Sequence, residues 1–412
     1  MSVVASSARA RRTAAITIIG AGIMGATLAY QLARRGLREV VVLERQTVAS
    51  GSIGRATGGL RQQFADELDI IFAREGRHFY RQFIAEMQAQ ARPAALLPPP
   101  FYQYGYLFLV SDAERWRAMQ SYVALQQRLG VPSELLTPAQ VVARWPGLRL
   151  LADDLYGASF CPTDGYTDPA AMTQALLAEA RRQGIALYEH CPVVAIRTRR
   201  GRVWAVETPQ GRFLTPLVIN ATGAYAALTA RLVGITDLPV YPLRRQLYLC
   251  EAVTGLPPEL PMVVEQASGF HFRWRDGNLL LGLPHQPTPE EQAASLALAP
   301  EAFELRLDPS VWPQIQRVIA RRFPALVGLH LRQAWAGLYE MTPDEHPVLG
   351  PTEVEGFLCA CGFSGHGLMH APLAAQLLIE YVTTGKSSPL DIEQFSLRRF
   401  REGRLLPVTR LL

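Results

Sequence analysis

The sequence lacks most features that mark membrane, secreted and nucleic-acid-binding proteins. No apolar run reaches 18 residues, so we expect no transmembrane helix, and residues 1–13 hold no apolar segment of the kind that a secretory signal requires. Lysine is nearly absent, because Lys386 is the only one, and arginines carry most of the positive charge behind the net charge of +5. The basic run Arg9–Arg12 lies in a Ser/Ala-rich tail without a recognition motif, so we expect no nucleic-acid partner.

Cysteine is also sparse. The chain has five cysteines, which are Cys161, Cys191, Cys250, Cys359 and Cys361. Their odd number and scatter argue against a disulfide framework and for a reducing compartment, so we expect a cytoplasmic protein. Cys359 and Cys361 alternate within a strand-like run, and at most one of the two side chains faces a given site. We therefore expect them to pack in a core, and we expect no metal site.

Residues 16–35 predict a dinucleotide-binding turn. They read as a buried strand, a turn and a helix, and the turn has the spacing G-x-G-x-x-G at Gly20, Gly22 and Gly25. The first glycine permits the tight turn, the second lets the backbone approach a pyrophosphate, and the third lets helix and strand pack closely. A second apolar strand ends at Glu44, nineteen positions after Gly25, where an acidic residue can meet ribose hydroxyls.

A glycine-rich loop follows this second strand. Residues 45–64 are rich in Gly, Ser and Thr and poor in large apolar side chains, so they cannot build a core and are expected to lie against a ligand. Arg55 and Arg61 are the only charged residues between Arg45 and Asp66. An exposed, solvated arginine is the alternative at each position.

The 412 residues, of which 49% are apolar and 19% charged, are enough for two domains. Residues 91–150 follow a proline-rich boundary and look like an insertion into the nucleotide domain. Residues 186–219 predict four strands, the last at Phe213–Ile219, and Asn220–Gly223 close this segment with small residues that can approach a cofactor. Apolar runs in residues 226–335 alternate with turns, which predicts an antiparallel sheet, and a helix follows near Val311–Arg322. The fold class is therefore α/β, with a Rossmann-type domain and an α+β domain whose sheet is mainly antiparallel.

Three groups of sequence stretches carry a resemblance to a known family. They are GAGIMG…VVVLER with GRATGGLRQQF, then FCPTDGYTDPAAM and VINATGAYA, and then MTPDEHPVLG…GFSGHGLMHAPLAAQLL. Together they resemble the FAD-dependent amine oxidoreductases of the D-amino-acid oxidase superfamily. The branch that they resemble most is that of sarcosine oxidases and dye-linked L-proline dehydrogenase β-subunits, over about residues 14–385.

The resemblance implies how the chain is divided. It implies a glutathione-reductase-like FAD-binding domain made of residues 14–90, 151–225 and 336–400. The substrate-binding domain would consist of residues 91–150 and 226–335, and residues 1–13 and 401–412 would be tails.

The resemblance also implies contacts to FAD from all three segments of the first domain. The candidate residues are Gly20, Gly22, Ile23, Met24, Gly25, Glu44, Arg45, Arg55, Ala56, Thr57, Gly58, Gly59, Val194, Ala221, Thr222, Gly223, Gly337, Gly362, Gly365, His366, Gly367, Leu368 and Met369. Backbone N–H groups of residues 362–368 would stabilise negative charge on the reduced ring. The implied reaction transfers a hydride from the substrate C–H to flavin N5 and leaves an imine that hydrolyses, with O2 or another acceptor taking the electrons.

Departures from the family pattern shape the expectations for the substrate. Gly337 stands where monomeric sarcosine oxidases have the cysteine that binds flavin, so we expect non-covalent FAD. Met369 replaces a lysine and Tyr339 an arginine, which are two usual carboxylate anchors. Arg61 remains as the bidentate carboxylate anchor. Tyr339 would bond the substrate or wall the pocket, and His285 is either a substrate-facing residue or a surface histidine.

The sequence leaves several functions open. The leading one is oxidation of the C–N bond of a small amino acid or N-alkyl amino acid, of sarcosine or proline type, by an oxidase or a dehydrogenase. Glycine or D-amino-acid oxidation is the close alternative, weakened by Tyr339. A non-catalytic flavoprotein subunit of an electron-transfer complex is a third, and either a homo-oligomer or a hetero-oligomer is compatible with the sequence. An NAD-binding module without flavin does not explain the GRATGGLRQQF and GFSGHG stretches.

Overall fold

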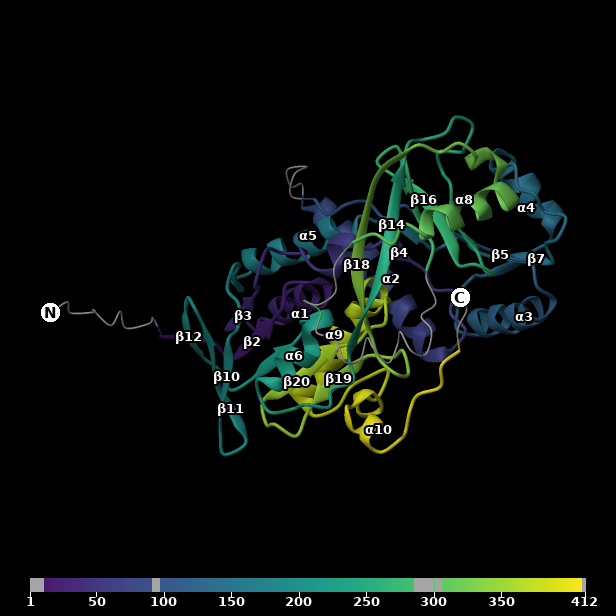
Figure 1. Ribbon diagram of the computed structural model, residues 1–412. Helices are drawn as coiled ribbons and strands as arrows, with labels where there is room; N and C mark the ends of the chain where they lie inside the picture. The colour runs from purple at the N-terminus through teal and green to yellow at the C-terminus, as the bar shows by residue number, and fades with distance from the viewer. Residues whose placement is uncertain (1–10, 91–96, 285–299, 301–305, 410–412) are drawn as a thin grey trace.

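Two sheets organise the chain, of which the computed structural model describes residues 11–90, 97–284, 300 and 306–409 (Figure 1). The first sheet has six strands in the spatial order β19 (Val348–Pro351), β20 (Phe357–Cys361), β13 (Val218–Asn220), β2 (Ile16–Ile19), β3 (Val40–Leu43) and β9 (Ala186–Tyr188). All neighbours are parallel except β19 and β20. Strands β2, β3, β13 and β20 are buried along their whole length, as expected when both faces of a parallel sheet are covered.

Helices cover one face of this six-stranded sheet, and a four-stranded sheet together with one short helix covers the other face. On the first face lie α1 (Ile23–Arg34), α5 (Pro169–Arg182) and α9 (Gly367–Thr384), with α2 (Glu67–Ala89) packed on α9. On the other lie α6 (Ala226–Arg231) and a sheet in the order β1 (Arg11–Thr13), β12 (Gly211–Leu214), β11 (Arg202–Thr208) and β10 (Ala195–Arg199).

The second main sheet has eight strands and is mainly antiparallel. Its order is β18 (Leu331–Met341), β14 (Tyr241–Cys250), β17 (Asn278–Gly282), β16 (Phe270–Arg275), β15 (Met262–Glu265), β5 (Tyr106–Val110), β7 (Gly157–Cys161) and β6 (Glu134–Leu136). Only β15 and β5 pair in parallel. One face packs on α4 (Pro138–Arg144) and α8 (Val311–Arg322), and the other packs on α3 (Ala113–Arg128).

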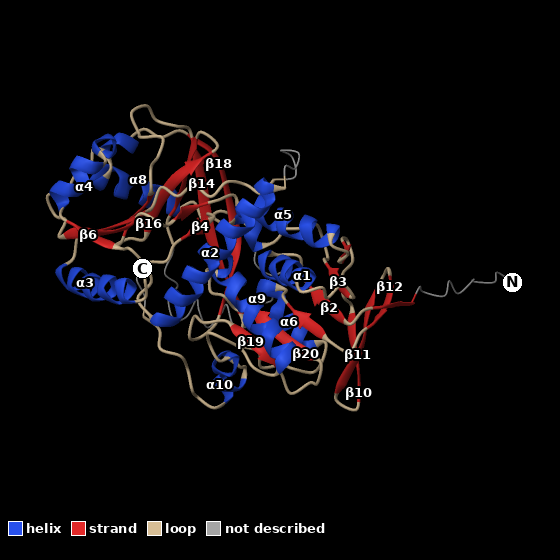
Figure 2. Cartoon of the chain, turned by 180° about the vertical axis from the view of Figure 1, so that it is seen from behind, coloured by secondary structure: helices blue, strands red, loops and turns tan. Residues whose placement is uncertain are grey.

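Strands β14 and β18 connect the two halves of the molecule. In Figure 1 they run from the region of α9 and β19 toward the region of α8, and Figure 2 shows the same arrangement from behind. A two-stranded ribbon of β4 (Gly59–Leu60) and β8 (Gly165–Tyr166) lies between the halves, and α10 (Arg398–Arg401) follows the last long helix. None of the described helices is long and apolar enough to cross a membrane.

Local sequence signals explain where several helices begin. Asp112 accepts a hydrogen bond from the N–H of Arg115 at the start of α3, and Asp168 caps α5, whose first residue is a proline. Thr137 and Gln140 form a reciprocal capping box at α4. These bonds use only residues within one turn, so the sequence alone places them.

The predicted fold class is confirmed, but tertiary pairing changes several predicted boundaries. The single strand expected at Phe213–Ile219 is wrong, because the chain leaves β12 before Pro216, which has no N–H for a ladder, and enters the other sheet as β13. The eight-stranded sheet includes β7 and runs to Met341, beyond the expected ranges 91–150 and 226–335. Residues 11–13, expected in a tail, form β1. The wider domain division stays a prediction.

Candidate cofactor and substrate site

The three glycines in the turn between β2 and α1 have different surroundings, and these indicate why each is a glycine. Gly20 has a φ of +105°, and a Cβ on it would lie 2.5 Å from the carbonyl oxygen of Ala221. A Cβ on Gly25 would overlap the carbonyl oxygen of Gly20, so this glycine is required where α1 crosses the turn. Gly22 has no such neighbour in the described part of the chain, because a Cβ there would meet none of its atoms within 4 Å. The protein itself gives no packing reason for Gly22, whereas a ligand on the open side does.

The N-terminus of α1 is available to an anion. No side chain caps it, and its first turn, which begins with Ile23 and Met24, contains no acidic residue. The unpaired N–H groups and the positive end of the helix dipole therefore face the open side of Gly22. Glu44 directly follows β3 beside this turn, and its carboxylate accepts the N–H of Ala21 at 2.8 Å and that of Gln46 at 2.8 Å. Each oxygen of Glu44 keeps a lone pair for a further donor such as a ribose hydroxyl.

A cavity of about 310 Å³ lies between the two halves of the molecule. One wall is the glycine-rich loop, through Arg55, Ala56, Thr57, Gly58 and Gly59, and another is the start of α9, through Gly365, His366, Leu368 and Met369. The roof is one face of β14 and β18, where Arg245 pairs with Gly337 and Leu243 pairs with Tyr339. Residues that are far apart in the sequence thus enclose one space.

Arg61 lies inside this cavity and is only 8% exposed. Its guanidinium packs 3.8 Å above the centre of the Phe64 ring and donates to the carbonyl oxygen of Gln63. Nη2 lies 3.5 Å from Nε2 of His366, and the backbone N–H donates to Sδ of Met369. Burial lowers the pKa of Arg61, but arginine stays protonated at neutral pH. No carboxylate of the described residues bonds this buried, oriented cation directly, so it suits an anionic ligand.

Two other predicted substrate residues have different outcomes. Tyr339 lines the cavity, and its ring lies 5.3 Å from the Arg245 guanidinium. Its ring also fills the space that a Cβ on Gly365 would need, so the glycine permits this contact. His285 lies outside the described residues, and its assignment stays a prediction.

The sequence did not single out His271, which also borders the cavity. Its Nδ1 lies 3.0 Å from the carbonyl oxygen of Gly269. A carbonyl only accepts, so Nδ1 carries the proton and Nε2 is left as the acceptor. Burial lowers the pKa of His271, which keeps the ring neutral. Its place on β16 gives no local signal that would have distinguished it from an ordinary half-buried strand residue.

Glu340, also missed from the sequence, supports the loop at residues 362–367. It accepts the N–H of Gly362 at 3.0 Å, and burial raises its pKa to about 7. Its carboxylate lies 3.7 Å from the place of a Cβ on Gly223, so the candidate segments around Gly223 and Gly362 meet here. Gly367 begins α9, whose N-terminus has no side-chain cap. Within this loop, the N–H of Gly362 donates to the Glu340 carboxylate and that of Ser364 donates to the Glu340 carbonyl, so Glu340 fixes the backbone that precedes α9.

Three of the other candidate residues for the cofactor, Arg45, Ala221 and Thr222, follow strands of the six-stranded sheet, whereas Val194 precedes β10 of the four-stranded sheet. Ala221 and Thr222 follow β13, and the Thr222 hydroxyl donates a hydrogen bond of 2.7 Å to Oδ1 of Asn220. The Arg45 guanidinium lies 3.7 Å above the Tyr225 ring. Val194 is 53% exposed, and its N–H already donates to the carbonyl of Glu207, which leaves its own carbonyl as a possible contact.

Comparison with known proteins identifies the family. Residues 15–381 match the family of FAD dependent oxidoreductases called DAO. The chain belongs to this family. Its cofactor is therefore FAD, which agrees with the open cradle at Gly22 and with the cavity that borders Gly337 and the 362–369 loop.

Individual relatives share both sequence and fold with the chain. L-proline dehydrogenase from P. horikoshii superposes with a TM-score of 0.86 at 29% identity, covering 96% of this chain and all of that one. Mouse (Mus musculus) sarcosine dehydrogenase is 28% identical over 400 residues, which is 95% of this chain but 42% of that protein. FAD-dependent oxidoreductase domain-containing protein 1 of Bos taurus is 29% identical, over 94% of this chain and 85% of that protein. The chain thus spans less than half the length of the sarcosine dehydrogenase that it resembles.

Proposed function

We propose that this protein oxidises the C–N bond of a small N-substituted amino acid of sarcosine or proline type, with Arg61 holding the substrate carboxylate. The observation that carries the proposal is the placement of Arg61 in the cavity that borders both Gly337 and the start of α9. Relatives named for proline and sarcosine dehydrogenation support the substrate class. When bound, FAD supplies the hydride acceptor, and the chain supplies binding, orientation and proton handling.

Arg61 is suited to orient a carboxylate rather than only to attract it. The Phe64 ring and the carbonyl of Gln63 fix the plane of its guanidinium, so two parallel N–H donors can face one ligand. The neighbouring Met369 and Tyr339 carry no positive charge that could replace it. A carboxylate fixed in this way holds the rest of a small substrate against the wall formed by Gly337 and Gly365.

His271 is the group proposed to receive the proton that an ammonium substrate must lose before its C–N bond is oxidised. Its Nδ1–H is engaged by the Gly269 carbonyl, so Nε2 has the free lone pair. Apolar side chains that line the cavity, among them Leu243, Leu247 and Met262, exclude water from the same space. Low water content strengthens the ionic contact of Arg61 with its ligand.

An anaerobic reduction experiment tests the function. The holoprotein is mixed with sarcosine or L-proline without oxygen, and bleaching of the flavin absorbance reports substrate oxidation. Air or a dye added afterwards shows which acceptor reoxidises the flavin. Retention of the oxidised spectrum with every N-alkyl amino acid and every α-amino acid tried would contradict the proposal and would favour a non-catalytic flavoprotein subunit.

Variants of Arg61 test the anchor. Loss of a buried charge partner costs about 2–4 kcal/mol, so Arg61→Ala should lower kcat/KM for L-proline by roughly 30- to 900-fold, chiefly through KM. Arg61→Lys keeps the positive charge but loses the two parallel N–H donors of the guanidinium, so its kcat/KM should lie between those of wild type and Arg61→Ala. Pyrrolidine, which lacks the carboxylate, is the matched control and should react equally with all three proteins. Full activity of Arg61→Ala on L-proline would show that the carboxylate is held elsewhere.

A further inference from the structure

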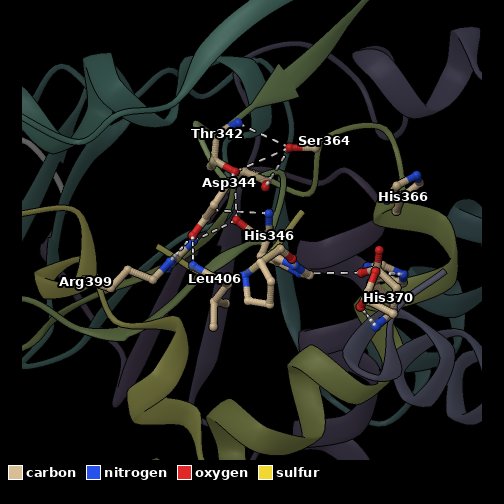
Figure 3. A network of polar contacts seen from close by, with 12 residues as sticks. Thr342, Asp344, His346, Ser364, His366, His370, Arg399 and Leu406 are labelled. Carbon is tan, nitrogen blue, oxygen red and sulfur yellow. Dashed lines mark hydrogen bonds and ion pairs between the residues drawn. The ribbon is translucent and has the colours of Figure 1, made fainter. Parts of the chain in front are cut away.

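Beside Arg61 lies a group of four ionisable side chains, three of them buried and His366 partly buried, called here the Asp69 cluster: Asp69, His346, His366 and His370. They come from α2, from the loop between β18 and β19, and from the start of α9. Asp69, His346 and His370 are 8%, 3% and 1% exposed. In Figure 3, His346 lies between the residues around Asp344 and the side chains of His366 and His370. The cluster borders the substrate cavity through Asp69, His346 and His366.

Polar atoms without a partner are concentrated in this cluster. Eleven buried side-chain nitrogen and oxygen atoms of the described residues lack a hydrogen bond, and five of them belong to the Asp69 cluster. Asp69 Oδ1 lies 3.6 Å from His346 Nδ1 and 3.8 Å from His370 Nε2, beyond the range of a hydrogen bond. A buried polar group left unpaired costs about 1–3 kcal/mol, so this arrangement points to a role other than stability.

Aromatic side chains surround the cluster, so charges within it are screened only weakly. The Phe72 ring stacks on His370 at 5.2 Å, and Phe64 lies 5.0 Å from His366 and 5.5 Å from His370. Burial raises the pKa of Asp69, an effect to which Asp66 adds, and it lowers the pKa of His366 and of His370. These two histidines are therefore neutral at neutral pH, and Asp69 gains its charge at a higher pH than an ordinary aspartate does.

A short path connects Asp69 to the carboxylate anchor. The ligand-type atoms of Asp69, His366 and His370 all lie within 4.8 Å of one another, and His366 Nε2 lies 3.5 Å from Arg61 Nη2. An ionised Asp69 is thus an anion close to the guanidinium, in surroundings that screen it little. It attracts the same cation that a substrate carboxylate needs, and it repels that carboxylate.

We propose that Asp69 is a positioning residue whose protonation controls how Arg61 holds a substrate carboxylate. With a proton on Asp69, the guanidinium is available to the substrate. When that proton leaves to solvent through the cavity, the Asp69 carboxylate competes for Arg61 and binding weakens. This inference rests on the proposed function, because it takes Arg61 as the carboxylate anchor.

Other charged or titratable groups face Asp69, so a pH dependence of carboxylate binding has to be assigned to Asp69 by substitution. They are Asp66 on its own helix, Glu345 and His346 on the loop before β19, His366 and His370 on α9, and Arg61. The same cluster contains the residue types that bind transition metals. A guanidinium 3.5 Å from one of these histidines opposes a second cation there. Metal analysis therefore belongs to the test.

The test measures binding of small carboxylates to the holoprotein, so it needs no known substrate. Acetate and propionate are titrated between about pH 5.5 and pH 9.5, and the change in the visible flavin spectrum gives Kd. Wild type should lose about tenfold in affinity as Asp69 ionises. Asp69→Asn, which mimics the protonated acid, should bind at every pH as wild type does at low pH, and Asp69→Ala should share this flat profile. Asp112→Asn, the same change at a remote helix cap, should keep the wild-type profile.

The outcomes separate this inference from the proposed function. A pH-dependent Kd that persists unchanged in both Asp69 variants overturns the role of Asp69 and leaves Arg61 as the anchor. Failure of wild type to bind acetate or propionate at any pH overturns both proposals. A stoichiometric transition metal in purified wild type that Asp69→Asn lacks overturns the inference in favour of a metal site. Once a substrate is known, the Asp69→Asn effect should appear in the pH profile of KM and not in kcat.

Discussion

Alanine substitution at Gly22 should separate cofactor binding from folding. The backbone there has φ −76° and ψ −173°, which alanine adopts freely, and a Cβ meets no atom within 4 Å. Alanine in place of glycine at a helix N-cap lowers the free energy of unfolding by about 0.5–1 kcal/mol. Alanine also restricts the unfolded chain, which raises the free energy of unfolding by about 0.4–1 kcal/mol. These terms nearly cancel, so the free energy of unfolding of the apoprotein should change by less than about 1 kcal/mol.

FAD binding should respond far more strongly to the same change. The added methyl group occupies the open side of the turn, where the pyrophosphate is proposed to approach the N-terminus of α1. Displacing it removes at least one charge-assisted hydrogen bond, worth about 1.5–3 kcal/mol. At about 1.4 kcal/mol for each factor of ten, Kd for FAD should rise roughly 10- to 150-fold.

The assay pairs Gly22→Ala with Gly25→Ala. Flavin is removed from each protein, FAD is titrated back to obtain Kd, and the apoproteins are unfolded by heat. A Cβ on Gly25 overlaps the carbonyl oxygen of Gly20, so this control should destabilise the apoprotein by about 1–3 kcal/mol or more. The reasoning is refuted if Gly22→Ala binds FAD as wild type does, or if its apoprotein is as unstable as Gly25→Ala.

Three further predictions concern the cofactor and the core. Glu44→Ala should purify with less FAD and melt at a lower temperature, because the carboxylate holds the dinucleotide turn and is proposed to bond the ribose; unchanged flavin occupancy would contradict the second role. Acid precipitation should release yellow flavin into the supernatant, since Gly337 offers no nucleophile; colour in the pellet would disprove non-covalent binding. Asp344→Ala should lower the free energy of unfolding by about 3–5 kcal/mol, because it leaves the buried Arg399 guanidinium without its carboxylate partner. Asp237→Ala, which breaks an exposed ion pair, should lower it by less than about 1 kcal/mol, and thermal unfolding measures both effects.

The Asp344 pair also predicts an acid limit to stability. Burial alone would raise the pKa of Asp344, but hydrogen bonds from Arg399 lower it overall. A carboxyl whose pKa is lower in the folded state contributes stability above its unfolded pKa and loses that contribution as the pH falls through its folded pKa. The Asp344→Ala variant should therefore lose less stability than wild type on acidification below about pH 4.

Features that depend on neighbours along the chain could be predicted from the sequence. The strand before Gly20, the start of α5 at Asp168 and the limits of α8 at Val311–Arg322 all follow from patterns within a few turns. The reason is that caps, turns and amphipathic periods act over distances of one to four residues. The family resemblance rested on such local motifs, and the comparisons confirm it.

Features that depend on which segments meet in space required the tertiary structure. The sequence could not show that the apolar run before Pro216 joins one sheet and the run after it another, because both runs are equally apolar. It favoured His285 and did not single out His271, although His271 lines the cavity together with His346 and His366. Asp69 and His370 are about 300 positions apart, and neither stands in a pattern that indicates the other. Their approach is decided by the packing of α2 on α9, whose free energy comes from apolar contacts along both helices rather than from these polar side chains.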